Sequence, residues 1–70
     1  MNLEKLGKRI KLQRVAHDES QEQLAEAIGA TSCSIGNWEK GENEPRLRYL
    51  ERIAVHYKMS TTKLIEGCVK

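Results

Sequence analysis

Apolar residues recur along this chain at the three- and four-residue spacing of an amphipathic helix, and no stretch alternates as a half-buried strand does. Near the N-terminus, Leu6 and Ile10 lie on one face of a predicted helix that Asn2 can cap and that ends at about Ala16. Arg14 continues that face one turn later, where a core residue is expected. The first element is therefore predicted to be a helix with one charged residue on its buried side.

Two further helices are bounded by residues that favour helix ends. Ser20 and Gln23 match a capping box, in which each side chain accepts a hydrogen bond from the other residue's backbone N–H. Gly29 is expected to end this helix in the left-handed conformation that glycine adopts at no steric cost. Thr31 can cap a third helix over residues 32–40. The sequence thus predicts two helices joined by a tight turn around Gly29.

The second half of the chain is predicted to hold a loop and two more helices. The loop covers residues 41–45 and contains Pro45, the only proline. A fourth helix is predicted from about residue 47 to residue 57, and Ser60 can cap a short fifth helix that Gly67 ends. The predicted buried positions of the fourth helix are Leu47, Leu50, Ile53, Ala54 and Tyr57.

A chain of 70 residues has room for one domain, and we expect residues 1–70 to form a single all-α domain of five short helices. Hydrophobic residues make up 39% of the chain and charged residues 31%, a balance typical of globular proteins rather than of disordered or fibrous ones. No apolar run approaches the roughly 20 residues that span a bilayer, and the N-terminus has no signal-peptide pattern. These features predict a cytoplasmic location and no membrane partner.

Charge is distributed unevenly, although the net charge is only +2. Residues 1–16 carry a net charge of +4, residues 17–44 carry −6, and residues 45–70 carry +4. Basic segments of this kind can bind a polyanion such as nucleic acid, and they can equally form an ordinary solvated surface. Charge alone therefore leaves both interpretations open.

Residues 21–40 carry the pattern that points to function. Two helices that cross steeply over a short turn need a small side chain at the crossing, a positive φ in the turn and an apolar residue between them. Ala25, Gly29 and Ile35 meet these needs in order, and Trp38 adds to the packing. This helix-turn-helix leaves one face of its second helix exposed, and that face can enter the major groove of DNA.

The residues in and around this motif resemble the helix-turn-helix domain of lambdoid phage repressors, Cro proteins and the small bacterial regulators related to them. The resemblance extends from Gly7 to Ile65 and rests on Ser20-Gln21-Glu22-Gln23-Leu24-Ala25, Gly29, Ile35, Trp38-Glu39-Lys40-Gly41, Pro45 and Leu47. The family implies a compact five-helix, lambda-repressor-like DNA-binding domain. It also implies a transcriptional regulator, expected to be a repressor, that binds a near-palindromic double-stranded DNA operator as a homodimer.

The resemblance further implies which side chains contact DNA. Ser32, Cys33 and Asn37 match the base-facing positions of the recognition helix. The amide of Asn37 is suited to adenine, whose N6 and N7 it can address together, whereas serine discriminates weakly and cysteine is a poor hydrogen-bonding group. Contacts to the sugar-phosphate backbone are expected from Gln21, Ser34, Lys40, Asn43 and Arg46. We therefore expect modest sequence specificity, or specificity that depends on DNA shape.

Two other roles follow from the resemblance or from the fold it implies. Arg14 and Glu39 match an ion pair that ties the first helix to the end of the third, which would account for an arginine on an apolar face. A dimer interface is expected around the fifth helix. It would use Tyr57, Leu64, Ile65 and Val69 as exposed side chains, unless these side chains close the core of the monomer instead.

Other functions find less support in the sequence. Cys33, Cys68, His17 and His56 have none of the spacings of a zinc site, and no nucleophile motif stands beside a positioned base. We therefore expect no metal, no other cofactor, no small-molecule ligand and no enzymatic activity. The alternative from another class is an antitoxin-type subunit that keeps this fold and binds a protein partner. Few residues follow the predicted fifth helix, which leaves little chain to wrap a toxin and favours the DNA-binding regulator.

Overall fold

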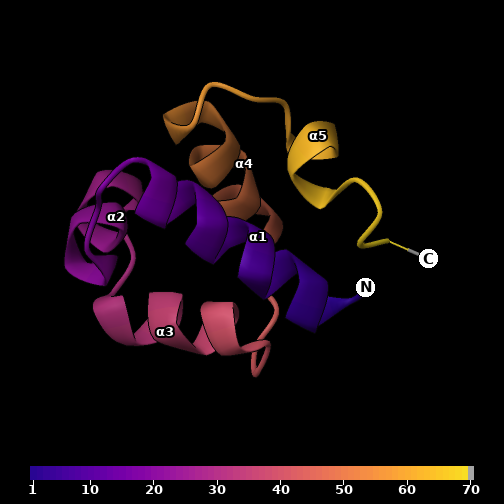
Figure 1. Ribbon diagram of the computed structural model, residues 1–70, viewed down its shortest axis with the longest axis horizontal. Coiled ribbons are helices and arrows are strands. Elements are labelled where there is room, and N and C mark those ends of the chain that lie inside the picture. Colours follow the sequence, from indigo (N-terminus) through magenta and orange to yellow (C-terminus); the bar gives the residue numbers. More distant parts are fainter. Residues whose placement is uncertain (70) are drawn as a thin grey trace.

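The computed structural model describes residues 1–69, which form five α-helices joined by short connections (Figure 1). The helices are α1 (Leu3–Ala16), α2 (Gln21–Ile28), α3 (Ser32–Lys40), α4 (Leu47–His56) and α5 (Thr61–Ile65). No strand occurs within these residues, and none of their helices is both long and apolar enough to cross a bilayer. The five-helix, all-α architecture expected from the sequence is confirmed.

The helices pack around α1, which crosses the middle of the molecule (Figure 1). α3 lies along one side of α1, and α4 and α5 lie on the other side, while α2 closes one end. The two chain ends come together, because the backbone N–H of Asn2 donates to the carbonyl of Cys68. This arrangement leaves the outer side of α3 uncovered along its length.

Side chains cap four of the five helices in residues 1–69, and all four caps are the predicted ones. Ser20 and Gln23 form the capping box of α2, with both reciprocal hydrogen bonds present. The other side-chain caps are Asn2, Thr31 and Ser60. Gly29 ends α2 with a φ of 74°, which is the predicted left-handed conformation. α4 begins after Arg46, whose side chain forms no cap hydrogen bond.

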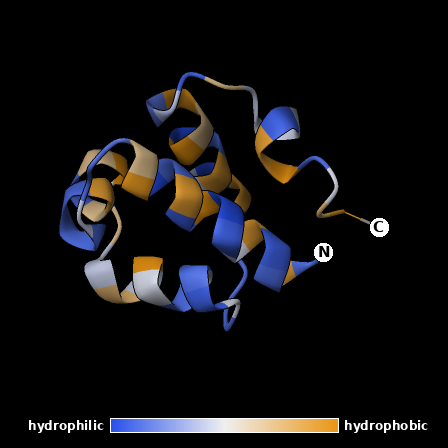
Figure 2. Ribbon diagram, viewed as in Figure 1, coloured by the Kyte–Doolittle hydropathy of each residue, from blue (hydrophilic) through white to orange (hydrophobic). Residues whose placement is uncertain are grey.

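The core draws on every helix, and hydrophobic stretches gather where helices meet (Figure 2). Its fully buried members include Leu6, Ile10, Leu24, Ile35, Ile53 and Leu64. Arg14 does occupy the inward face of α1, as the spacing predicts, with its side chain 12% exposed. The burial of Trp38 against the ring of Tyr49, 5.4 Å away between centroids, closes the core beneath α3.

One expectation about exposure is wrong, and one pair of alternatives is decided. Leu47 is 65% exposed rather than buried, because it stands in the first turn of α4, where half-buried Tyr49 packs against the core instead. For Tyr57 and Leu64, the exposed dimer surface is wrong and the alternative of a buried position is confirmed, since they are 6% and 0% exposed. Both close the core of the monomer, since α5 packs directly on α4 and α1.

Two residues of α1 hold helices in place in ways that the sequence did not predict. A Cβ on Gly7 would lie 2.3 Å from the carbonyl oxygen of Trp38, so only glycine allows α1 and the end of α3 to approach this closely. On another side of α1, the guanidinium of Arg9 donates to the carbonyls of Leu64, at 3.0 Å, and Glu66. These contacts fix α3 and α5 on α1.

Candidate nucleic-acid interface

The outer side of α3 is the exposed face that the helix-turn-helix pattern predicts. α3 turns Ile35 and Trp38 into the core, so the opposite side of the helix faces solvent. Around that side lie exposed Ser32, Cys33 and Lys40 and half-buried Gly36 and Asn37. The three predicted base-contacting residues therefore share one accessible face.

Asn37 and Cys33 lie one helical turn apart on this face. The Asn37 Nδ2 is 4.0 Å from the Cys33 Sγ, a weak contact that leaves the amide able to form other hydrogen bonds. Ser34 sits to one side, where its hydroxyl accepts a hydrogen bond from that of Thr31. Most side chains on this face are short, so the α3 backbone can approach a partner closely.

The turn between α2 and α3 is held from both sides. Ala25 is 4% exposed where the two helices cross, and its carbonyl accepts the backbone N–H of Ala30. From α4, the Arg52 guanidinium donates to the carbonyl of Ile28 at 3.1 Å. Arg52 therefore satisfies a carbonyl at the open end of α2, a long-range contact that the local sequence pattern does not reveal.

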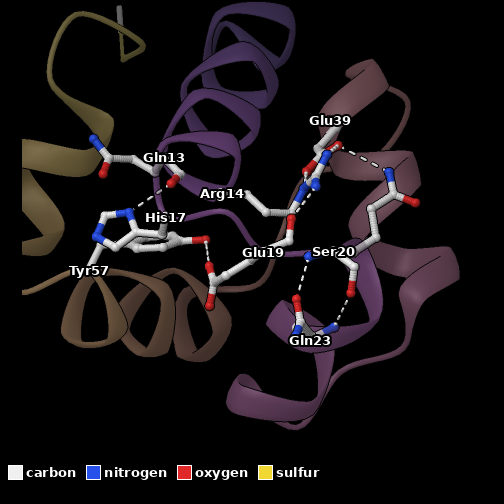
Figure 3. A network of polar contacts seen from close by, with 9 residues as sticks. Gln13, Arg14, His17, Glu19, Ser20, Gln23, Glu39 and Tyr57 are labelled. Atoms are coloured by element: carbon white, nitrogen blue, oxygen red, sulfur yellow. Dashed lines mark hydrogen bonds and ion pairs between the residues drawn. The ribbon is translucent and has the colours of Figure 1, made fainter.

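A buried ion pair fixes α3 on α1 (Figure 3). The Arg14 Nε lies 2.7 Å from one Glu39 carboxylate oxygen, and its Nη2 lies 3.2 Å from the other. The Arg14 side chain is 12% exposed and that of Glu39 is 5% exposed. The hydrogen bond with Glu39 raises the pKa of Arg14 above its ordinary value, although burial acts in the opposite direction. The ion pair that the resemblance implied is present.

Gln21 joins this network at the first turn of α2. Its Nε2 donates to a Glu39 carboxylate oxygen at 3.1 Å. The Gln21 amide also lies 3.7 Å from the position that a Cβ on Gly36 would take. The residue expected to bind a phosphate is thus held against α3, at the edge of its exposed face.

Three of the predicted backbone-contacting residues line one hollow beside α3. Ser34, Asn43 and Arg46 border this open space of about 410 Å³, together with Trp38, Glu44 and Tyr49. Lys40 is exposed on the last turn of α3. The hollow combines hydroxyl, amide and guanidinium donors with one carboxylate, so its chemistry suits a phosphate only where Glu44 turns away.

Residues 10–64 match the family model described as helix-turn-helix. The chain belongs to this family. It is the Cro/C1-type family of DNA-binding transcriptional regulators that the sequence resembles, and it is not a family of enzymes.

Solved structures of helix-turn-helix proteins are closely similar to this chain. The restriction-modification controller protein C.AhdI from Aeromonas hydrophila is 29% identical, with a TM-score of 0.82 over 89% of this chain and 94% of its own. The P22 c2 repressor, solved with a synthetic operator, is 27% identical, with the same TM-score and the same coverage of both chains. The competence regulator ComR from Streptococcus vestibularis is 29% identical, with a TM-score of 0.85 over 96% of this chain but only 23% of its own. No curated protein sequence matches this chain.

One polar cluster of this helix-turn-helix domain was not predicted. Glu19, in the connection between α1 and α2, accepts the Tyr57 hydroxyl at 2.8 Å (Figure 3) and lies 2.6 Å from the His56 Nε2. Burial acts to raise the pKa of Glu19, but the hydrogen bonds with His56 and Tyr57 outweigh it and hold that pKa below its ordinary value. Burial and the neighbouring Glu19 raise the pKa of Tyr57. The cluster ties the entry to α2 to the end of α4.

Proposed function

We propose that this protein is a sequence-specific regulator that binds double-stranded DNA by placing α3 in the major groove. The observation that carries this proposal is the shared exposed face of α3, on which Ser32, Cys33 and Asn37 lie together in a domain of the helix-turn-helix family. α3 is held from behind by the core and by the buried pair of Arg14 and Glu39. A rigid helix with an open outer side is what major-groove recognition requires.

Base reading is assigned mainly to Asn37. An asparagine amide can donate to the N7 of adenine and accept from its N6, a pairing that discriminates by about 1–3 kcal/mol against the wrong base. Ser32 and Cys33 are exposed one turn or more towards the start of α3 and are short, so they contact bases only where the helix approaches closely. Specificity then comes from a small number of direct contacts together with DNA shape.

Contacts to the DNA backbone are assigned to residues of α3 and around it. Beside the last turns of α3, Gln21 can turn its second amide hydrogen to a phosphate while Glu39 retains the first. Ser34, in the first turn of α3, borders one hollow together with Asn43 and Arg46, and Lys40 is exposed on the last turn. Exposed Glu42 and Glu44 in the same loop oppose a phosphate, so each monomer neutralises few phosphates and binds weakly.

Weak binding by one monomer favours a homodimer that occupies two half-sites of a near-palindromic operator. Such a dimer would act as a repressor by covering a promoter. The P22 c2 repressor, 27% identical to this chain, was solved with a synthetic operator, which supports the binding of an operator by this chain. With Tyr57 and Leu64 in the core, the candidates for the dimer surface are half-buried Ile65 at the end of α5 and exposed Val69 in the segment that follows α5.

Selection of bound duplexes from a random pool, using the full chain at low ionic strength, tests this function. The expected result is an enriched motif made of two inverted half-sites whose centres lie one helical turn apart, about 34–36 Å. Selection with Asn37→Ala in parallel should lose preference at one base pair in each half-site. A pool that shows no enrichment, or a wild-type protein that binds no duplex, would rule out sequence-specific DNA binding.

A further inference from the structure

An apolar patch on the outer side of α1 has no role in the fold. Leu12 and Val15 are 67% and 57% exposed, whereas the core side of α1 is formed by Leu6 and Ile10. Leu12 and Val15, together with Lys8 and Lys11 one turn earlier in α1, line a shallow hollow of about 260 Å³. Two large apolar side chains one turn apart therefore form a single exposed patch next to two lysines.

A second hollow continues this patch towards α5. It has a volume of about 270 Å³, and Leu12 also borders it, together with half-buried Met59 and with Lys63 and Glu66. We call the two hollows that meet at Leu12 the Leu12 surface. It runs across α1 to α5 and presents apolar side chains along its floor and charged side chains at its rim.

The Leu12 surface lies away from the DNA interface. α3 packs on the side of α1 that carries Gly7 and Arg14, and none of the side chains assigned to DNA contact borders either hollow. A partner on the Leu12 surface can therefore bind while α3 is occupied by DNA.

The charge of the rim is predominantly basic. Lys8, Arg9, Lys11 and Lys63 border the two hollows, against one carboxylate, that of Glu66. The pairs Lys8–Glu4 and Lys63–Glu66 are exposed and long, at 3.6 and 3.9 Å, so water screens them and a competing carboxylate can replace either partner. Lys11 is in no ion pair within residues 1–69.

We propose that the Leu12 surface binds an acidic amphipathic helix of a partner protein. Apolar side chains at positions i, i+3 or i+4 of that helix would cover Leu12 and Val15, and its flanking carboxylates would reach Lys8, Lys11 and Lys63. A second copy of this chain fits poorly, because a symmetric contact would bring the same lysines together. A membrane fits poorly as well, since Leu6 and Ile10 are in the core, Leu3 is half-buried, and only Leu12 and Val15 of α1 are exposed for insertion.

Titration of the 15N-labelled full chain tests this proposal. The probe is a synthetic 18-residue helical peptide with leucines on one face and glutamates beside them; the control peptide has lysines in place of the glutamates. Amide shifts are expected to move at residues 8–15 and 59–66 with the acidic peptide alone, and to weaken as salt is raised. Leu12→Ser should weaken the affinity at least tenfold and Lys11→Glu several-fold. Leu47→Ser, which replaces an equally exposed leucine on α4, should leave the affinity unchanged.

Other outcomes would overturn the proposal. It fails if the acidic peptide moves no shifts at the Leu12 surface, if the basic peptide binds as well, or if Leu47→Ser has the same effect as Leu12→Ser. Binding of the chain to anionic phosphatidylglycerol vesicles instead of the peptide would assign the surface to a membrane. Dimerisation in the ultracentrifuge that Leu12→Ser abolishes would assign it to a second copy. DNA binding by Leu12→Ser should equal that of the wild type, so this test and that of the proposed function fail independently.

Discussion

At the scale of single residues, the proposed recognition of DNA bases depends on the amide of Asn37. Asn37→Ala should weaken binding to the selected operator by about 1–3 kcal/mol and leave binding to unrelated DNA almost unchanged, because only base reading is removed. Fluorescence anisotropy on both duplexes measures the two losses. Asn43→Ala is the matched control, since it removes an amide assigned to the backbone and should weaken both duplexes alike. Equal losses for Asn37→Ala would show that Asn37 reads no base.

The pair of Arg14 and Glu39 provides a second prediction at this scale. Arg14→Met removes the charged partner of Glu39, whose side chain is 5% exposed in the intact pair, so the free energy of unfolding should fall by about 3–5 kcal/mol in urea denaturation. Lys8→Met, which breaks the exposed pair with Glu4, should change it by less than about 0.5 kcal/mol. Similar, small effects of both substitutions would mean that the buried pair contributes nothing to stability.

Glu19 makes stability depend on acid pH. Because its pKa is lower in the folded state than the ordinary value of 4.5, its contribution is fully present above pH 4.5. That contribution is lost as the pH falls through the lower folded-state pKa. Glu19→Gln should therefore be less stable than the wild type at neutral pH, and the difference should shrink as the pH falls below 4.5. A difference that stays constant on acidification would contradict this role.

At the scale of helices, two glycines inside helices are expected to respond in opposite ways to the same substitution. Gly36→Ala should raise the free energy of unfolding by up to about 1 kcal/mol, because alanine favours a helix and the added Cβ would meet only the Gln21 side chain, at 3.7 Å. Gly7→Ala should lower it by about 1–3 kcal/mol or more, since the Cβ would meet the Trp38 carbonyl at 2.3 Å. Thermal melts of both variants check this contrast, and a stabilised Gly7→Ala would disprove the close approach of α1 to α3.

The helices themselves could be predicted because their ends are encoded locally. Ser20 with Gln23 and Gly29 determine where α2 begins and ends through contacts within a few residues. The long-range contacts that hold one helix against another could not be predicted in the same way. Arg9 and Arg52 each donate to a carbonyl far along the chain, and nothing in the local spacing distinguishes them from ordinary surface arginines.

The burial of side chains near helix ends was the other feature that the sequence did not predict correctly. Leu47 continues the apolar spacing of α4 and is nevertheless exposed, since it belongs to a first turn that the body of the domain does not cover. Leu64 was a candidate for an exposed dimer surface, but it is the one fully buried residue of the five-residue α5, whereas its neighbour Ile65 is half-buried. Apolar periodicity predicts which face of a helix is buried. It does not predict how far along the helix the neighbouring elements cover that face.

At the scale of the whole molecule, basic charge lies in the two ends of the sequence and acidic charge in the middle, yet α3, which we propose as the recognition helix, comes from the acidic middle. Positive charge for DNA must therefore come from a few residues such as Lys40 and Arg46. Arg46→Ala should weaken binding to every duplex and reduce the slope of log affinity against log salt by about one. Lys58→Ala, on the exposed connection after α4, is the control and should leave the slope unchanged. An unchanged slope for Arg46→Ala would remove Arg46 from the phosphate contacts.

The family resemblance indicated which residues belong to the candidate site, and the structure supports the site by leaving those residues accessible. Resemblance placed Ser32 and Asn37 towards DNA, and the fold leaves both on the open side of α3. The resemblance gave no sign of the Leu12 surface, because an exposed leucine next to a lysine has the same local pattern as a solvated helix face. Only the packing of α5 beside α1 turns that leucine into part of a continuous patch.

The burial of Trp38 has a practical consequence. It is the single tryptophan of the chain, and its ring lies 5.4 Å from that of Tyr49, beside the hollow assigned to a phosphate. Light absorbed by Tyr49 will pass to Trp38, so the emission of one native chromophore reports both unfolding of the core and any ligand that shifts the tyrosine. The protein therefore carries its own optical probe of occupancy, and no attached dye is needed to follow it.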